Sequence, residues 1–305
     1  MKDASSWRDP GSKRGALIRL LLFVPLFKAV EYLLLIVFFG LLGGVKGSAE
    51  FLSAGATLIA ALLAGGLMIV KVDHRAFGAL GFARTEQTGR ELGAGFGIGG
   101  AGIVAATVVS LSIGGLTYVA ERGTPTQWLS TVLFDLLVFA IAAAAEESVF
   151  RGYAFQVLAR SVGPVTATLG ASVMFALAHA GNPNVSLLAL VNIFLAGVLL
   201  SMAYLRTMSL WFATAVHAGW NWTMASLFDL PVSGLAMFKT PLYEPVVRGP
   251  SWISGGTFGP EGGIAGTLGM VVCVIVLVYL VRLRVAPRMS ALRPIALANV
   301  MEEQG

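Results

Sequence analysis

Residues 128–150 read WLSTVLFDLLVFAIAAAAEESVF, an apolar run that ends in two adjacent glutamates. A helix of about 20 apolar residues spans the hydrocarbon core of a bilayer. An ionisable side chain in such a helix costs roughly 2.5–3.5 kcal/mol on insertion scales, so it persists when it is paired or functional. The stretch therefore indicates a membrane-spanning helix and marks Glu146 and Glu147 as candidate functional residues.

The composition of the whole chain agrees with a membrane protein. Of the 305 residues, 56% are hydrophobic and 12% are charged, which is about half the charged share of a soluble domain. So few charges could not shield that much apolar surface in a soluble fold, and the same balance excludes disorder. The single cysteine, Cys273, excludes an intramolecular disulfide and cysteine-rich zinc sites, and we expect a packed core thiol there.

Seven further apolar stretches flank this one. The eight cover residues 17–44, 51–71, 92–119, 128–150, 163–180, 184–205, 208–230 and 263–283. We predict an all-α fold: a polytopic transmembrane helical bundle of about eight transmembrane helices, forming a single integral membrane domain over residues 1–305. Because the first stretch carries Lys28 and Glu31, seven spans with residues 17–44 on the membrane surface is the alternative. The small residues of the second and third stretches, including Gly95, Gly97 and Gly100, are expected to pack helices closely.

The positive charges are distributed asymmetrically along the chain. With eight spans and the N-terminus inside, sixteen Lys and Arg fall in inside segments and four in outside segments, while Lys28 lies within the first stretch. This bias predicts that both termini are cytoplasmic. It also accounts for the net charge of +5 without a nucleic-acid partner. Short loops and no recognisable targeting signal are compatible with a multi-pass protein of a bacterial plasma (inner) membrane, with a eukaryotic internal membrane as the alternative.

Helix geometry gives the two glutamates different roles. Glu147 and Arg151 are four residues apart with the acid first, which is the favoured order for a helical ion pair. Glu146 points about 100° away from Glu147 around the helix, so Arg151 does not match it in the same way. We expect Glu146 to face a cavity; a solvated helix end at the cytoplasmic face is the alternative.

Two histidines also lie in apolar stretches. If the helices of 128–150 and 163–180 form a hairpin that turns near residues 161–164, Glu146 and His179 each lie about sixteen residues, or ~24 Å, from the turn. His217 and Asn221 are four residues apart, hence on one face of their helix. Four polar groups from three helices are therefore expected to meet at one depth, provided that the helices are straight.

This set predicts hydrolysis by water without a protein nucleophile. Glu146 and His179 would hold and deprotonate a water, and His217 and Asn221 would donate hydrogen bonds to the oxyanion. Two His and a Glu can also bind zinc, but the HExxH spacing is absent and Asn is a poor zinc ligand. We expect no cofactor, with a zinc-dependent membrane protease as an alternative. A non-enzymatic membrane scaffold or regulator is another, and a proton-coupled transporter would require internal repeats, which we do not see.

Three motifs give these residues a family resemblance. EESVFR (146–151), FALAH (175–179) and HAGWN (217–221) match the EExxxR, FxxxH and HxxxN motifs of the CPBP family, the type II CAAX prenyl protease and bacteriocin-processing (Abi) membrane endopeptidases. The chain resembles this family over about residues 128–225, which we take as the catalytic core.

The resemblance implies an intramembrane peptidase of the glutamate type, CAAX prenyl endopeptidase-like, whose cavity opens to the cytosol and bilayer. It implies that Glu146 and His179 activate water and that His217 and Asn221 form the oxyanion site. It further implies supporting roles for Glu147, Arg151 and Phe175. The implied partners are membrane lipids and peptide or protein substrates, prenylated or otherwise membrane-associated, with no nucleic acid.

Overall fold

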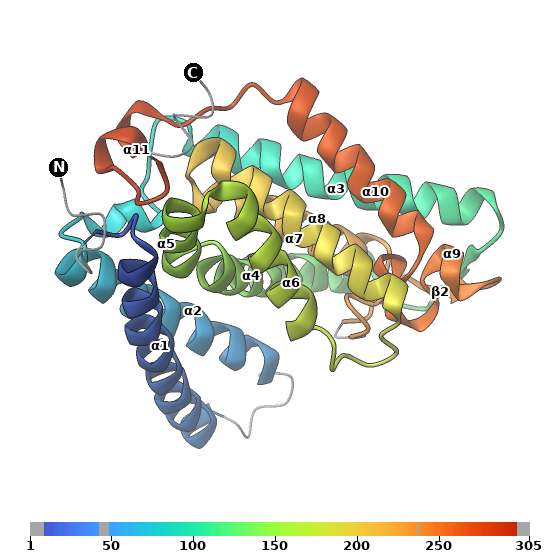
Figure 1. The fold of residues 1–305 in the computed structure, drawn as a ribbon. Helices are drawn as coiled ribbons and strands as arrows, with labels where there is room; N and C mark the ends of the chain where they lie inside the picture. The colour runs from blue at the N-terminus through green and yellow to red at the C-terminus, as the bar shows by residue number, and fades with distance from the viewer. Residues whose placement is uncertain (1–8, 43–48, 237, 298–305) are drawn as a thin grey trace.

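The computed structural model describes residues 9–42, 49–236 and 238–297, and most of this chain is helical (Figure 1). The longer helices are α1 (Lys13–Leu42), α2 (Ala49–Leu67), α3 (Thr88–Ser112), α4 (Pro125–Phe150), α5 (Tyr153–Val162), α6 (Pro164–Ala178), α7 (Leu187–Thr207), α8 (Leu210–Trp222) and α10 (Ile264–Ile275). Three π-helical turns extend α2, α8 and α10: η1 (Met68–Val72), η3 (Thr223–Leu227) and η6 (Val276–Leu280). Short helices are η2 (Phe77–Leu80), α9 (Ser251–Ser254), η4 (Gly256–Phe258), η5 (Pro260–Gly262) and α11 (Pro287–Leu292).

Each of the eight apolar stretches contains a helix, but eight full spans are not established. Among the described residues, five helical segments are long and apolar enough to cross a membrane, namely 13–42, 49–72, 88–112, 125–162 and 187–207. The segments 164–178 and 264–280 are apolar but shorter. The first stretch belongs to the longer group, and its two charges pair, because Lys28 Nζ lies 2.7 Å from Glu31 Oε2. The chain is thus an integral membrane protein with several apolar helices.

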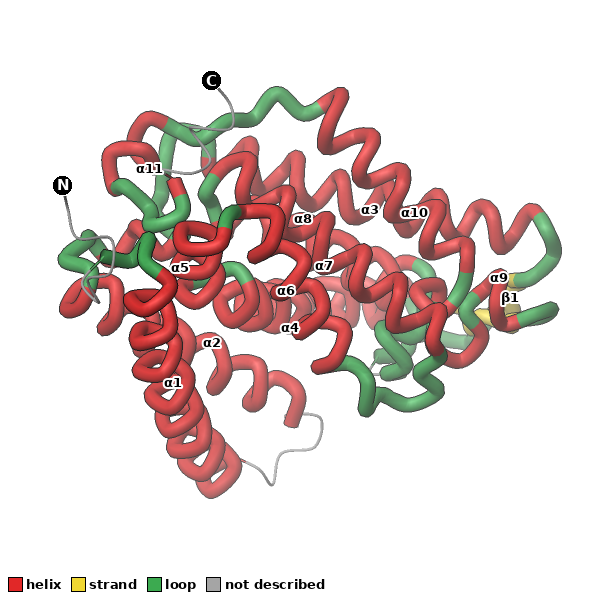
Figure 2. The backbone as a smooth tube through the Cα atoms, viewed as in Figure 1, coloured by secondary structure: helices red, strands yellow, loops and turns green. Residues whose placement is uncertain are grey.

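The fold is mostly helical as predicted, with one short two-stranded sheet that the sequence analysis did not predict. Helix α3 ends at Ser112, seven residues before the end of the apolar stretch at 119, and strand β1 (Leu116–Ala120) follows. It pairs antiparallel with β2 (Tyr243–Val247), so that Leu116 lies opposite Val247 (Figure 2). The partner strand lies more than 120 residues away, so nothing in the local sequence distinguishes this strand from the end of an apolar helix.

The predicted turn between the fourth and fifth stretches is confirmed. The chain before that turn, however, is not one straight helix. Gly163, with φ +87°, connects α5 to α6. Helix α4 stops at Phe150, and α5 follows it as a separate helix. Gly152 lies at this break, and a Cβ there would collide with the Ser148 carbonyl oxygen. The break therefore needs glycine, and the depth argument based on straight helices does not hold.

Small residues let α3 lie against α8 and α10, and the predicted close packing is confirmed at Gly95 but wrong at Gly97. A Cβ on Gly95 would lie 2.8 Å from the Phe212 carbonyl oxygen, whereas one on Gly97 would meet nothing within 4 Å. Cys273 on α10 is fully buried and its Sγ donates to the Ile98 carbonyl oxygen at 3.2 Å. The packed core thiol is confirmed, and the glycines on one face of α3 serve close helix contact.

The segments predicted to lie inside the cell gather at one end of the molecule. Arg19 near the start of α1 pairs with Asp73 after α2 at 2.8 Å, and the Tyr153 hydroxyl donates to the same carboxylate at 2.8 Å. Near the C-terminus, the Ile295 amide donates to Gln156 of α5 at 2.9 Å. Figure 1 shows the start of α1 and helix α11 on this side. These contacts bring the predicted inside segments together, and the count of spans and their cytoplasmic side stay predictions.

Candidate functional site

A cavity of about 570 Å³ lies between the helices and receives all four residues that the sequence singles out for catalysis. It is lined by Glu146 of α4, His179 at the end of α6, and His217 and Asn221 of α8. The opposite wall comes from α2, including Ser53 and Thr57. The four polar groups thus share one cavity although α4 does not run straight to the hairpin turn.

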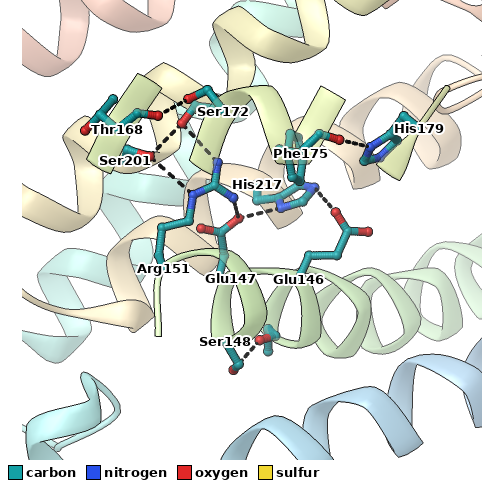
Figure 3. Close-up of polar contacts among 12 residues, drawn as sticks. Glu146, Glu147, Ser148, Arg151, Thr168, Ser172, Phe175, His179, Ser201 and His217 are labelled. Atoms are coloured by element: carbon teal, nitrogen blue, oxygen red, sulfur yellow. Dashed lines mark hydrogen bonds and ion pairs between the residues drawn. The ribbon is translucent and has the colours of Figure 1, made fainter. Parts of the chain in front are cut away.

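The predicted ion pair between Glu147 and Arg151 is present and fully buried. Arg151 Nη1 lies 3.1 Å from Glu147 Oε1, and both side chains are 0% exposed (Figure 3). Arg151 Nη2 also donates to the Gly197 carbonyl oxygen at 3.0 Å. A buried charge persists only when it is compensated and hydrogen-bonded, and Arg151 meets both conditions by linking α4 to α7.

Glu147 has a second partner that helical spacing does not predict. His217 Nδ1 lies 2.9 Å from the same Glu147 Oε1 (Figure 3). Because a carboxylate oxygen accepts, Nδ1 carries the hydrogen and donates it. One oxygen therefore receives both the guanidinium of Arg151 and the imidazole of His217, and this shared contact fixes the orientation of the His217 ring.

Glu146 occupies a different position from its neighbour. Its side chain is 36% exposed, and its Oε2 lies 3.9 Å from His217 Nε2, beyond hydrogen-bond distance. That oxygen is shielded from solvent and accepts no hydrogen bond within the described part of the chain. Glu146 thus faces the cavity without an ion pair to Arg151, as its position on the helix indicates, and it keeps an acceptor available.

His179 is held by its own helix. Its Nδ1 lies 2.8 Å from the Phe175 carbonyl oxygen one turn earlier (Figure 3). A carbonyl can only accept, so Nδ1 carries the hydrogen and Nε2 of the neutral ring is an acceptor. The described structure gives no direct hydrogen bond between His179 and Glu146, so the two acceptors contribute separately to the cavity.

Phe175 is the aromatic centre of the site. Its buried ring lies 4.7 Å from the Arg151 guanidinium carbon and has its centroid 4.8 Å from the His179 ring. The His217 ring lies edge-on at 6.0 Å. A cation over an aromatic face is favourable, and a bulky ring in contact with both histidines restricts their motion. These contacts give the first residue of the FxxxH pattern a physical role.

Asn221 lies one helical turn beyond His217 and lines the same cavity. Its side chain makes no hydrogen bond to the residues that the structure describes, so its amide donor is available to a ligand.

Glu261 is a buried carboxylate of this cavity that the sequence analysis did not identify. Its Oε1 accepts from Trp220 Nε1 at 2.9 Å, and its Oε2 accepts from the Ser233 amide and hydroxyl at 2.8 and 2.7 Å. It therefore fastens the irregular segment after α8 to the cavity wall. The available signal was a lone acid in a Gly- and Pro-rich stretch, which usually indicates only a solvated loop.

Zinc coordination finds no support in the arrangement of donors. Over residues 9–42, 49–236 and 238–297, no group of three or more His, Cys, Asp or Glu side chains is arranged to hold a metal ion. The Nδ1 atoms of both histidines already make hydrogen bonds to protein oxygens. We derive no step through a metal.

Comparison with known proteins agrees with the motifs. Residues 126–223 match the family model described as Rce1-like, type II CAAX prenyl endopeptidase Rce1-like. None of the curated proteins matches the chain significantly. The matched residues contain all three motifs and every cavity residue named for catalysis. Residues 126–223 therefore carry a domain of the CPBP family of membrane proteases.

Proposed function

We propose that this protein is an intramembrane endopeptidase in which Glu146 activates a water molecule for attack on a peptide bond. The observation that carries the proposal is the convergence of Glu146, His179, His217 and Asn221 on one cavity inside a bundle of apolar helices. The substrate is a peptide or protein at the membrane, with or without a prenyl anchor, and the reaction needs no cofactor. We place the protein in a bacterial plasma membrane with both termini cytoplasmic.

Water activation follows from the acceptors on the cavity wall. The Glu146 carboxylate and Nε2 of His179 each accept one hydrogen, so a water between them can donate both of its hydrogens. Its oxygen lone pair then points away from both groups, toward a substrate carbonyl. Glu146 takes the proton as the water oxygen bonds to the carbonyl carbon, and it returns that proton to the leaving amine.

The oxyanion contact sets a condition on His217. Its Nδ1 hydrogen is committed to Glu147, so Nε2 can donate to an oxyanion only if the ring is protonated on both nitrogens. Glu147 at 2.9 Å and Glu146 at 3.9 Å compensate that positive charge. Asn221 supplies the second donor. A preorganised cationic donor is effective, because it stabilises charge where the charge develops without solvent reorganisation.

Glu147, Arg151 and Phe175 act through these groups rather than on the substrate. Glu147 holds the proton on Nδ1 of His217, and Arg151 holds Glu147. Phe175 anchors His179 by its carbonyl oxygen and packs on Arg151. We therefore regard all three as positioning residues.

The test is peptide cleavage by the purified full-length protein in detergent, followed by mass spectrometry. Prenylated CAAX peptides and unprenylated copies are offered to wild type and to Glu146→Gln. The matched control is Glu244→Gln, the same chemical change at an acid with a 52% exposed side chain on β2. A defined C-terminal fragment from wild type and the control, absent with Glu146→Gln, is the expected result.

Two outcomes would contradict the proposal. Retained cleavage by Glu146→Gln would refute Glu146 as the base. A Glu146→Gln variant that unfolds or fails to express would favour the non-enzymatic scaffold, in which the same polar residues only hold helices together. Cleavage of the unprenylated copies alone would keep the peptidase and exclude a requirement for the lipid.

A further inference from the structure

A second cavity, of about 350 Å³, lies where the residues just before α1 meet those that follow α11. Three arginines line it: Arg75, Arg160 and Arg293. Among the described residues of its wall, Asp9 is the one acid, and Pro10, Pro294, Ile295 and Leu297 are the others. This cavity shares no residue with the one that holds Glu146.

The three arginines come from segments far apart in the sequence. Arg75 lies between η1 and η2, Arg160 is in the last turn of α5, and Arg293 follows α11. Arg293 adopts φ +52°, a left-handed backbone conformation that is uncommon for a residue with a side chain. The fold, and not a local run of basic residues, brings the three guanidinium groups to one cavity.

Asp73, the carboxylate whose charge acts most strongly on Arg75, already has partners of its own. Asp73 accepts from Arg19 and from the Tyr153 hydroxyl, both at 2.8 Å, so its oxygens are engaged.

Arg75 shows most clearly the effect of the neighbouring positive charges. Burial lowers the pKa of its guanidinium, and the positive charges of Arg160 and Arg293 lower it further, while Asp73 acts in the opposite direction. The side chains of Arg75 and Arg293 make no hydrogen bond to the described residues. Both guanidinium groups therefore keep their N–H donors available for a ligand.

We propose that this three-arginine cavity binds a phosphate-bearing anion. Like charges that converge in a partly buried cavity repel one another, and an anion removes that repulsion. Guanidinium groups bind phosphate oxygens through paired, charge-assisted hydrogen bonds, and Arg suits this geometry better than Lys. The phosphate belongs either to the headgroup of an anionic lipid or to a free phosphate compound in solution. The proposal does not depend on the peptidase activity.

The experiment uses the full-length protein and separates the two sources. In one arm, calorimetry of the detergent-purified protein measures binding of pyrophosphate from a chloride buffer. In the other, native mass spectrometry counts phosphatidylglycerol retained from mixed vesicles that also contain phosphatidylcholine. Binding of pyrophosphate identifies a soluble ligand, and selective retention of phosphatidylglycerol alone identifies a lipid headgroup. Failure of both arms overturns the proposal.

The variants test the location of the site. The double change Arg75→Gln with Arg293→Gln is expected to weaken binding at least about tenfold, since each lost guanidinium removes a charge-assisted contact. Arg248→Gln, the same charge change on an exposed loop near β2, is expected to leave binding unaltered. Equal weakening by Arg248→Gln would reduce the effect to net charge and overturn the site.

Stability without ligand gives an independent readout. Because neutralisation relieves repulsion, the double variant should melt at the same temperature as wild type or higher in a phosphate-free buffer. A lower melting temperature would mean that the arginines hold the fold together, and it would count against the site. Arg75→Lys, which keeps the charge and loses the fork, is expected to bind more weakly than wild type and more tightly than the double variant.

Discussion

The buried pair between Glu147 and Arg151 allows a quantitative test. We consider Arg151→Met, Glu147→Gln and the double variant as a thermodynamic cycle. Both side chains are fully buried, and their charged atoms are 3.1 Å apart. Each single change leaves the other charge in the interior without its partner, whereas the double change removes both charges at once.

The magnitudes follow from the contacts that remain. Breaking a buried pair costs about 3–5 kcal/mol of unfolding free energy. In Glu147→Gln, Arg151 keeps the Gly197 carbonyl at 3.0 Å and the face of Phe175 at 4.7 Å, so we expect about 3 kcal/mol. In Arg151→Met, Glu147 keeps only its contact with His217, so we expect about 4–5 kcal/mol. The double variant should lose less than either single change.

The assay is equilibrium unfolding in mixed micelles of a mild detergent and SDS, followed by tryptophan fluorescence. A coupling free energy of about 3 kcal/mol or more between the two positions is the expected result. Effects that add to within about 0.5 kcal/mol would show that the two residues act independently, and they would refute the reasoning.

Three further predictions use the same unfolding assay. Glu146→Gln should change the unfolding free energy by less than about 1 kcal/mol, because Oε2 of Glu146 accepts no hydrogen bond from the described chain. A loss of stability as large as that of Glu147→Gln would contradict this prediction. Gly95→Ala should lower the unfolding free energy by about 1–3 kcal/mol, since its Cβ would lie 2.8 Å from the Phe212 carbonyl oxygen. Gly97→Ala, which meets open space, should leave the unfolding free energy unchanged. Equal effects of the two variants would exclude a packing role for Gly95. Burial raises the pKa of Asp229, in the loop after η3, to about 6, above its unfolded value. The contribution of Asp229 to stability is therefore complete below about pH 4 and is lost as the pH rises through 6. Asp229→Asn should flatten the dependence of the unfolding free energy on pH in this range, and an unchanged slope would contradict the assignment.

The sequence predicts those features that depend on one helix. Apolar runs indicate where helices form because the bilayer requires length and hydrophobicity, and spacing of four residues correctly pairs Glu147 with Arg151. The same reasoning places Glu146 apart from Arg151. These inferences do not depend on which helices are neighbours.

Features that depend on contact between distant segments could not be predicted in this way. The bond between His217 and Glu147 joins residues 70 positions apart, so no helical period encodes it. The break at Gly152 arises because the backbone there approaches the Ser148 carbonyl oxygen, and an apolar run does not record that approach. The strand that begins at Leu116 likewise depends on its partner β2, more than 120 residues later in the chain.

The single oxygen of Glu147 that receives both Arg151 and His217 has a practical consequence for finding the natural substrate. A ligand that engages Nε2 of His217 favours the doubly protonated ring, and this strengthens the hold of Glu147 on α8 as well as on α4. A ligand bound in the cavity should therefore raise the melting temperature of the protein, because a ligand that binds only the folded state stabilises that state. Membrane peptides can accordingly be screened by thermal shift on the Glu146→Gln protein, which the proposed mechanism expects to bind a substrate without cleaving it.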